Sequence, residues 1–356
     1  MELFIPVVAP ERFHPNFKNA LLPGREGERE VVTAWLEGFK DRDGKLVTEF
    51  QTTFNSTFWE IYLHAVFREY GFEIDWRHSS PDFVVNTPNG GIVVEAVTAN
   101  AAQGAVPEWE KPGMMTGNVR YKNFWPLNRE AIIRLSNALL SKLNKHRASY
   151  AGMGHVKGKP FVVAVAPFEQ PDFQYQYDRP MRALLYDEYV DETAYFKNPG
   201  AFPNGPPSVK LVSIEKDNGA TIDLGIFNND DWREVSAVIF SCVATWGKTV
   251  AMSNRPAVGF VNTSWGTDET GKCEPRIARI GTPSETVTDG LQVFHNPHAL
   301  IPLDLKVFRR SGVVQHYVTP YGFIRESYEN CLQFRQTHKI TLHDDGKLAA
   351  QEYRQE

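Results

Sequence analysis

The chain has 356 residues, of which 42% are hydrophobic, 12% aromatic and 23% charged, and its formal net charge is −5. Its 8 Trp, 13 Tyr and 23 Phe exclude an intrinsically disordered chain, because so many aromatic side chains need a packed core. The acidic balance argues against a protein that coats nucleic acid without specificity. The length suits one large domain or two of average size.

Several features of the sequence bear on its location in the cell. The longest apolar runs, such as Phe161 to Phe168, are far shorter than the roughly 20 residues that cross a bilayer. The chain begins Met-Glu-Leu-Phe, with an acid where a signal peptide carries a base. The three cysteines, Cys242, Cys273 and Cys331, form no Cys-x-x-Cys pair, and we expect reduced thiols. The sequence therefore predicts a cytoplasmic protein with no membrane partner.

The first hundred residues predict an N-terminal extension, a helix and a strand meander. Residues 1–47 are rich in proline and charge, with one helical stretch near Glu28 to Lys40. A helix is predicted from about Ser56 to Tyr70, and Gly71 ends it. Asn89-Gly90 indicates a hairpin between the second and third of the strands that come next. The three predicted strands are Phe72 to Arg77, Asp82 to Asn86 and Ile92 to Thr98.

Beyond this meander, helices and apolar strands alternate. Pro126 opens a long amphipathic helix that reaches about Tyr150, and a second helix is expected over Pro180 to Val190. The order of elements predicts an α/β fold with a mixed central sheet flanked by helices. We place its core at 48–250 and assign 251–356 to a C-terminal region, packed on the core or forming a small accessory domain. The predicted strands in this half are Phe161 to Ala166, Ser236 to Val243, Ala257 to Asn262, Leu291 to His295 and Gly312 to Val318.

The hairpin brings two carboxylates together. With Asn89 and Gly90 as the central turn residues, paired positions sum to 179. Asp82 then lies opposite Val97, and Glu95 is its diagonal neighbour on the same face, roughly 7–8 Å away at the backbone. Two acids on an otherwise apolar hairpin are costly unless a cation or hydrogen bonds compensate them. Oxygen ligands on rigid strands suit Mg²⁺ or Mn²⁺, so the pair is a candidate metal site.

Ser80-Pro81-Asp82, followed by a hairpin and Glu95-Ala96-Val97, resembles the PD-(D/E)XK nuclease superfamily, which has the restriction-endonuclease-like fold. The resemblance covers roughly Thr52 to Ala166, and its motif is short. It implies that Asp82 and Glu95 bind Mg²⁺ and that the preceding helix supplies a further acid, a place that Glu60 matches. The alternative for Glu60 is an exposed acid paired with His64 one turn later.

The sequence departs from this pattern at one position, because Val97 stands where the family has its catalytic lysine. The long helix offers a replacement. On a helical wheel Lys142 lies about −20° from Leu135, inside the apolar stripe, whereas Lys145 lies about −80° away, at its edge. A lysine that faces the sheet needs a negative partner, which the two carboxylates would provide. We therefore expect the displaced lysine to be Lys142, with Lys145 in reserve; the alternative is a lysine whose charged end reaches solvent.

A basic segment surrounds this helix. From Lys111 to Pro160 ten lysines and arginines stand against one acid, Glu130, which gives a net charge of +9. Such a run is often only a solvated face, but its place beside the carboxylates predicts contacts with a nucleic-acid backbone. The residues expected to make these contacts are Lys111, Arg120, Lys122, Arg129, Arg134, Lys145 and Arg147.

A second motif resembles a phosphate-binding loop. Gly247-Lys248-Thr249 matches the last residues of that loop, but Cys242 stands where its first glycine should be. We therefore predict no nucleotide site there.

Together these features predict a Mg²⁺-dependent endonuclease (or Mn²⁺-dependent) that hydrolyses DNA, and the resemblance implies a place in restriction or anti-phage defence. The C-terminal region is a candidate for target recognition or for a homodimer surface. The alternative is a decayed nuclease fold, marked by Val97, that binds nucleic acid or a partner as a scaffold. A third interpretation is an unrelated α/β enzyme in which the Pro-Asp is coincidental.

Overall fold

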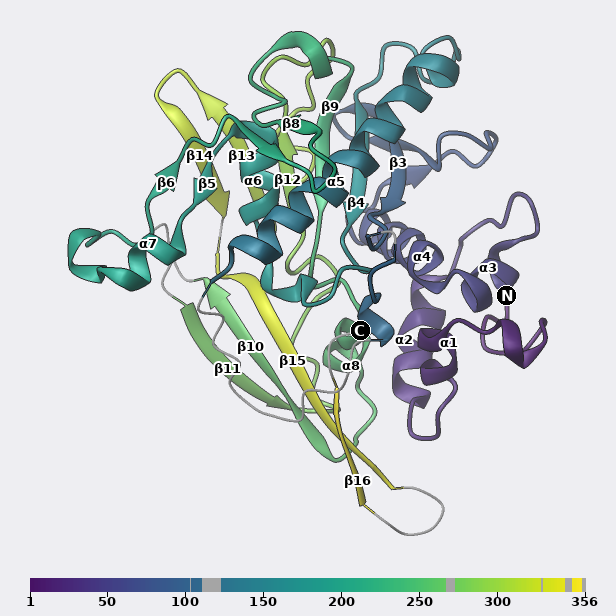
Figure 1. The fold of residues 1–356 in the computed structure, drawn as a ribbon. Helices are drawn as coiled ribbons and strands as arrows, with labels where there is room; N and C mark the ends of the chain where they lie inside the picture. The colour runs from purple at the N-terminus through teal and green to yellow at the C-terminus, as the bar shows by residue number, and fades with distance from the viewer. Residues whose placement is uncertain (103, 111–122, 267–272, 328, 343–347, 354–356) are drawn as a thin grey trace.

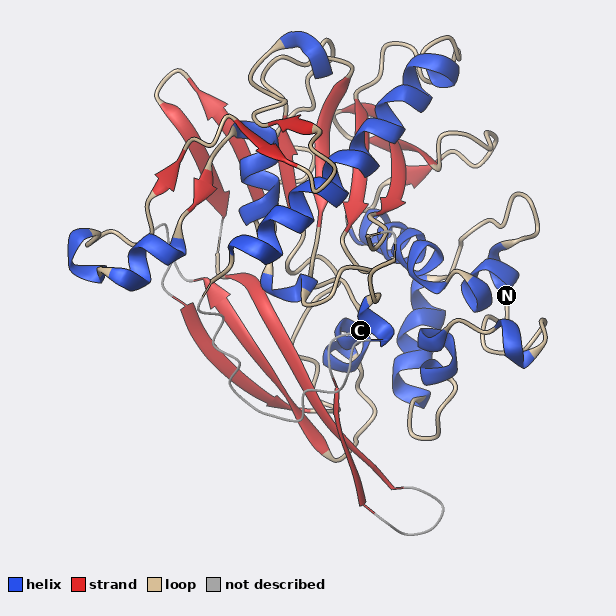
Figure 2. Ribbon diagram, viewed as in Figure 1, coloured by secondary structure: helices blue, strands red, loops and turns tan. Residues whose placement is uncertain are grey.

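The computed structural model describes residues 1–356 except 103, 111–122, 267–272, 328, 343–347 and 354–356. It has a mixed α/β fold in which helices flank a large mixed sheet, as the sequence predicted (Figure 2). No helix in the described part of the chain is long and apolar enough to cross a membrane.

Among the described residues, eight strands form the central sheet (Figure 1). Its middle strands β3, β4 and β9 are parallel to one another, as are β12 and β13, and the remaining neighbours are antiparallel. The strands β4 and β9 are buried along their whole length, which explains their continuous apolar sequences. In spatial order the strands are β1 (Glu73–Ile74), β2 (Phe83–Thr87), β3 (Gly90–Thr98), β4 (Phe161–Ala166), β9 (Val235–Phe240), β12 (Gln292–His295), β13 (Val314–Thr319) and β14 (Gly322–Ser327).

Smaller sheets complete the β structure of the described chain. A four-stranded antiparallel sheet lies at one end of the central sheet in Figure 1. Three strands of the central sheet, β12 to β14, also come from beyond residue 250, so that sheet does not stop at the expected core boundary. The four-stranded sheet has the order β11 (Cys273–Arg279), β10 (Gly259–Gly266), β15 (Cys331–Leu342) and β16 (Leu348–Tyr353); the two-stranded sheets are β5 (Tyr189–Val190) with β6 (Ser208–Val209) and β7 (Ser213–Glu215) with β8 (Thr221–Asp223).

Helices α4 (Phe54–Glu69) and α5 (Trp125–Lys145) carry the predicted site residues Glu60 and Lys142, respectively. Helix α4 is almost wholly buried, and its Trp59 donates to the carbonyl oxygen of Ala164 in β4 at 3.0 Å. Helix α5 crosses in front of the sheet in Figure 1 and ends in one π-helical turn, His146–Tyr150. The other helices are α1 (Pro15–Ala20), α2 (Glu26–Trp35), α3 (Leu46–Thr52), α6 (Arg179–Tyr186), α7 (Glu192–Lys197) and α8 (Trp246–Met252).

The expected hairpin register was wrong by two residues. Thr87 pairs with Gly90 and Phe83 with Val94, so paired positions sum to 177, and the turn residues are Pro88-Asn89. The Thr87 hydroxyl donates to the Gly90 carbonyl at 2.8 Å and accepts from the Asn89 amide at 3.1 Å, which closes the turn one residue earlier than expected. Because the shift is even, no side chain changes face.

Candidate functional site

Three carboxylates come from three different elements. Glu60 lies on α4, Asp82 directly precedes β2, and Glu95 lies in β3. Continuing the observed register by one residue beyond Phe83 places Asp82 beside Glu95 instead of diagonal to it. The Glu95 side chain is 0% exposed, whereas Asp82 and Glu60 are half-buried.

Asp82 is fixed by a hydrogen bond to the neighbouring strand. The amides of Val93 and Ala99 donate to carbonyls on the β4 side, so the Ala96 amide points to the β2 side. There β2 has already ended, and the Asp82 Oδ2 atom accepts from the Ala96 amide at 2.7 Å. A carboxylate thus takes the place of a backbone carbonyl at the end of the ladder.

Two lysines of α5 share one oxygen of Glu95. The Nζ atoms of Lys142 and Lys145 each lie 2.8 Å from Glu95 Oε1. Lys142 is 18% exposed and Lys145 46% exposed, so Lys142 is the more deeply placed of the two. The Lys145 ammonium also lies 5.1 Å from the centre of the Tyr150 ring, in cation–π range. The other oxygen, Glu95 Oε2, is buried and makes no hydrogen bond of ordinary length with the described residues, while the Tyr150 hydroxyl interacts with the Glu95 carboxylate.

These contacts separate the three carboxyl pKa values. Burial, helped by repulsion from Asp82, raises the pKa of Glu60 to about 8. Burial and the charge of Glu95 raise the pKa of Asp82 to about 6. Burial also acts to raise the pKa of Glu95, but Lys142 and Lys145 outweigh it and hold that pKa below its ordinary value. Near pH 7 the site therefore holds one protonated carboxyl, that of Glu60, and two carboxylates.

Glu60 interacts electrostatically with the pair and makes no described ion pair with His64 one turn later. Its charge is repelled by Asp82 and attracted by Lys142 and Arg42. His64 is buried, and its Nδ1 atom lies 2.8 Å from the carbonyl oxygen of Trp35. Over the described residues, no group of three or more His, Cys, Asp or Glu side chains is arranged to hold a metal ion. Asp82 and Glu95 are neighbours by the strand register, and Glu60 interacts with this pair through the charge of Asp82.

Donor chemistry decides whether a hard divalent cation fits here. Glu95 Oε2 is a buried carboxylate oxygen without a hydrogen bond of ordinary length to the described residues, which is costly unless a cation or proton approaches it. Asp82 presents a second carboxylate. Burial and the charge of Glu95 destabilise its ionised form. Oxygen-only donors of this kind fit Mg²⁺ or Mn²⁺.

Val97, at the position of the family lysine, is half-buried and packs against the hydrophobic core. It offers no donor, and the ammonium groups near Glu95 come from α5 instead.

The predicted nucleic-acid contacts are only partly within the described structure. Lys111, Arg120 and Lys122 lie outside the described residues. Each of the three described arginines is ion-paired with an acid. The pairs are Arg129 with Asp217 at 2.8 Å, Arg134 with Glu130 at 2.6 Å, and Arg147 with Glu234 at 2.9 Å.

Sequence reasoning missed the residues that hold the loop before Asp82. Arg42 donates to the carbonyl oxygens of Asp82, at 2.9 Å, and of His78. His155 Nε2 lies 2.7 Å from the Ser80 carbonyl, and its ring stacks on His78 with centroids 3.7 Å apart. Arg42 and Asp82 are 40 residues apart, and no local pattern links such positions.

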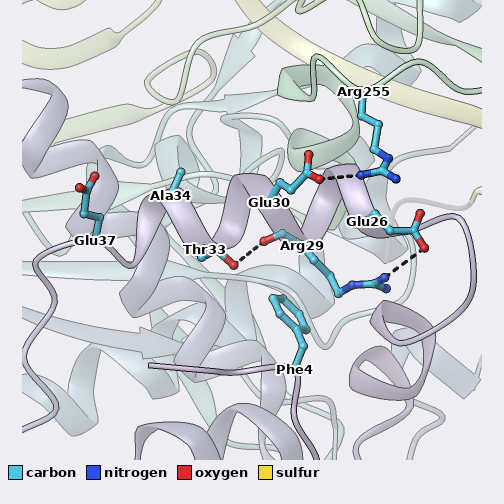
Figure 3. A pocket seen from close by; sticks show the side chains of 8 residues that line it. All are labelled: Phe4, Glu26, Arg29, Glu30, Thr33, Ala34, Glu37 and Arg255. Carbon is cyan, nitrogen blue, oxygen red and sulfur yellow. Dashed lines mark hydrogen bonds and ion pairs between the residues drawn. The ribbon is translucent and has the colours of Figure 1, made fainter.

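A pocket of about 640 Å³ lies elsewhere, along α2 (Figure 3). None of the site residues lines it. Four of its charged groups pair with one another, Arg29 with Glu26 at 3.2 Å and Arg255 with Glu30 at 2.7 Å, and Glu37 pairs with Arg68 at 3.0 Å. Because these charges are satisfied and exposed, the pocket shows no group poised for chemistry.

Comparison of the chain with protein-family models, with curated proteins and with solved structures finds no match. The resemblance to the PD-(D/E)XK superfamily therefore stays a prediction from the motif.

Proposed function

We propose that this protein is a divalent-metal-dependent nuclease that hydrolyses phosphodiester bonds of DNA. One observation carries the proposal: Glu95 is a fully buried carboxylate beside Asp82, with one oxygen held by two lysines and the other without a hydrogen bond of ordinary length to the described residues. Perturbed, incompletely satisfied titratable groups of this kind are more typical of a reactive site than of a structural ion pair.

Each residue of the site would have its own task. Asp82 and Glu95 would hold Mg²⁺ or Mn²⁺, and Glu60 would approach it directly or through water. A bound ion of this type polarises the scissile phosphate and acidifies the attacking water. Glu60, whose pKa is raised to about 8, can accept or release a proton near neutral pH. Lys142 would orient the water or offset negative charge that develops on the phosphate, and Lys145, half-exposed, would meet the substrate backbone.

The wider role derives from the same proposal. Basic side chains of residues 111–159, including Lys111, Arg120 and Lys122, would contact the DNA backbone, so binding should weaken steeply with salt. A nuclease core with additional strands suits restriction or anti-phage defence, either as a monomer or as a homodimer.

A scaffold without catalysis is the second candidate. It is favoured by Val97 and by the two lysines on Glu95, which neutralise the carboxylate without any metal. A scaffold of this kind would bind DNA equally well with Mg²⁺ and with EDTA.

The test combines cleavage with metal binding. Plasmid and single-stranded DNA are incubated with Mg²⁺, Mn²⁺ or EDTA, and Mn²⁺ binding is measured by calorimetry. We expect Glu95→Gln to lose roughly 10³-fold in cleavage and to lose Mn²⁺ binding, because it removes the buried ligand charge. Lys142→Met should lose roughly 10²-fold in cleavage but keep Mn²⁺ binding.

The matched control is Glu130→Gln, on the same helix as Lys142. Its ion pair in the described structure is with Arg134, one turn away. Its cleavage rate should stay within about twofold of wild type. Wild-type protein that neither cuts DNA nor binds Mn²⁺, yet binds DNA equally in Mg²⁺ and EDTA, would establish the scaffold instead.

A further inference from the structure

The loop between β1 and β2, residues 75–82, carries Asp82 at its last position. The ladder between β2 and β3 begins at Phe83, so strand pairing does not hold Asp82 itself. Two side chains from distant segments bind the loop carbonyls instead. Arg42 bridges the carbonyls of His78 and Asp82, and His155 contacts the carbonyl of Ser80.

Arg42 is itself well anchored. It lies between α2 and α3, where the Asp41 carboxylate accepts from the amides of Gly44 at 2.9 Å and Leu46 at 3.2 Å. Phe39 packs on Trp76 of the loop with ring centroids 5.1 Å apart, and the Arg42 guanidinium lies 5.7 Å from the same ring. These contacts fix the guanidinium over the loop, and its planar fork suits two carbonyl acceptors.

The bridge sets where the Asp82 carboxylate lies. Arg42 binds the carbonyl of the residue whose side chain accepts from Ala96 at 2.7 Å. Displacement of the loop backbone would therefore withdraw Oδ2 from the Ala96 amide and from the neighbourhood of Glu95. Ligands that are about 1 Å out of place lose much of their effect, which is why supporting residues matter.

We propose that Arg42 is a positioning residue that holds the Asp82 carboxylate in place for metal binding. The segment 1–47 is then part of the site rather than an accessory extension. The consequence for metal affinity rests on the proposed function, but the effect on Asp82 does not. Arg42 touches neither the carboxylate oxygens nor Glu95 in any described contact, so it acts through the backbone of the loop.

The Ala96 amide gives a readout that needs no metal. Its described hydrogen-bond partner is the Asp82 side chain, so its hydrogen exchange reports whether that side chain is in place. Exchange is measured on full-length protein labelled with ¹⁵N-alanine, in wild type, Arg42→Met and Arg42→Lys. Arg77→Met is the matched control, because Arg77 lies in the same loop, pairs with Asp75 in the described structure and is 84% exposed.

We expect Arg42→Met to accelerate exchange of the Ala96 amide about tenfold and to raise the half-saturating Mn²⁺ concentration about tenfold. Arg42→Lys should be intermediate, because lysine supplies one nitrogen where Arg42 uses two, Nη1 and Nη2, in a planar fork. Arg77→Met should stay within about twofold of wild type in both measurements. A further variant, Arg42→Ala, leaves room for a free guanidinium ion. Millimolar guanidinium should partly restore Ala96 protection in it, a rescue that a general loss of stability would not show.

Ala96 exchange within twofold of wild type in folded Arg42→Met, or in Arg42→Lys where the methionine variant does not fold, would overturn the inference. Wild-type protein that binds no Mn²⁺ would overturn the proposed function only. In that case the Ala96 exchange rates alone decide the role of Arg42.

Discussion

Two clusters of opposite charges around a buried glutamate, both within the described part of the protein, are built differently. In the first, Lys248 of α8, Arg335 of β15 and Glu285 are all 0% exposed. Lys248 donates to Glu285 and to the carbonyls of Thr286 and Asp289 at 2.9–3.0 Å, which uses all three of its protons. Arg335 binds both oxygens of Glu285, at 2.6 and 2.9 Å.

The candidate site is incomplete by the same standard. Both of its lysines bind one oxygen of Glu95, and the second oxygen makes no hydrogen bond of ordinary length in the described structure. Asp82 and Glu60 have raised pKa values, whereas the pKa of Glu285 is lowered because its two cations outweigh its burial.

The difference separates structural charge from reactive charge. A buried ion cluster that completes its hydrogen bonds is stable as it stands and joins the elements that supply it. A cluster with unpaired carboxylate oxygens has lower stability alone and becomes favourable when a cation arrives. The lysine of Gly247-Lys248-Thr249 belongs to the first kind, because its three protons are all donated within the protein.

The strongest test of this comparison removes a member of the complete cluster. Arg335→Met should lower the free energy of unfolding by about 3–5 kcal/mol, because it leaves Glu285 buried with a single cation. Glu95→Gln should lower it by less than about 1 kcal/mol, because its lysine partners reach solvent and lose little. Both values come from urea denaturation in EDTA near pH 7.

Equal losses for the two substitutions would break the distinction, since Glu95 would then be as structural as Glu285. A stable Arg335→Met variant would mean that solvent reaches Glu285 in solution.

The next test uses pH. Folded protein keeps the Glu60 proton up to a pKa of about 8, whereas the unfolded chain releases it near 4.5, so the folded state binds more protons between these values. Stability from this group is therefore present at low pH and is lost as the pH rises from about 4.5 to about 8. Glu60→Gln should match wild type near pH 4 and exceed its unfolding free energy by about 4–5 kcal/mol at pH 8.5 in EDTA.

The measurement is the difference between the two urea curves at each pH, because groups that do not interact with Glu60 titrate equally in both proteins and cancel. A difference that does not change with pH would place Glu60 in solvent and remove it from the site.

Local patterns in the sequence predicted the parts of the fold that local physics determines. The apolar runs of β4 and β9 and the helical period of α5 needed no knowledge of distant residues. The wheel that put Lys142 on the sheet-facing side agrees with its 2.8 Å contact with Glu95. The sequence prediction missed the hairpin register because it placed Asn89-Gly90 at the centre of the turn. In the structure the Thr87 hydroxyl closes a turn centred on Pro88-Asn89.

Long-range pairing accounts for the rest. Strands β12 to β14 join the central sheet although they follow β9 by about fifty residues or more, and no period in their sequence indicates that neighbour. Arg42 reaches the site by tertiary packing alone. The basic residues between 111 and 160 make that segment net positive. The partners of Arg129 and Arg147, however, are Asp217 and Glu234, which lie well beyond it in the sequence.

The smallest expected effect concerns this last group and extends the comparison to the surface. Arg147 binds Glu234 with two parallel hydrogen bonds, at 3.0 and 2.9 Å, and is 44% exposed. Exposed pairs of this kind contribute about 0–1 kcal/mol, so Arg147→Gln should change the unfolding free energy by less than about 1 kcal/mol. Its guanidinium is already matched to a carboxylate. The slope of log affinity for DNA against log salt should therefore change by less than about 0.5, where a cation that contacts phosphate contributes about 0.9.

Glu234→Gln tests the same point from the other side. It frees Arg147 and should raise DNA affinity about twofold at low salt, with a steeper salt dependence. A slope that falls by about 1 in Arg147→Gln would show that Arg147 leaves Glu234 for a phosphate when DNA binds. Surface ion pairs such as Arg147–Glu234 would then exchange partners when DNA binds, and the surface, like the buried site, would hold charges that are fully paired only with a ligand bound.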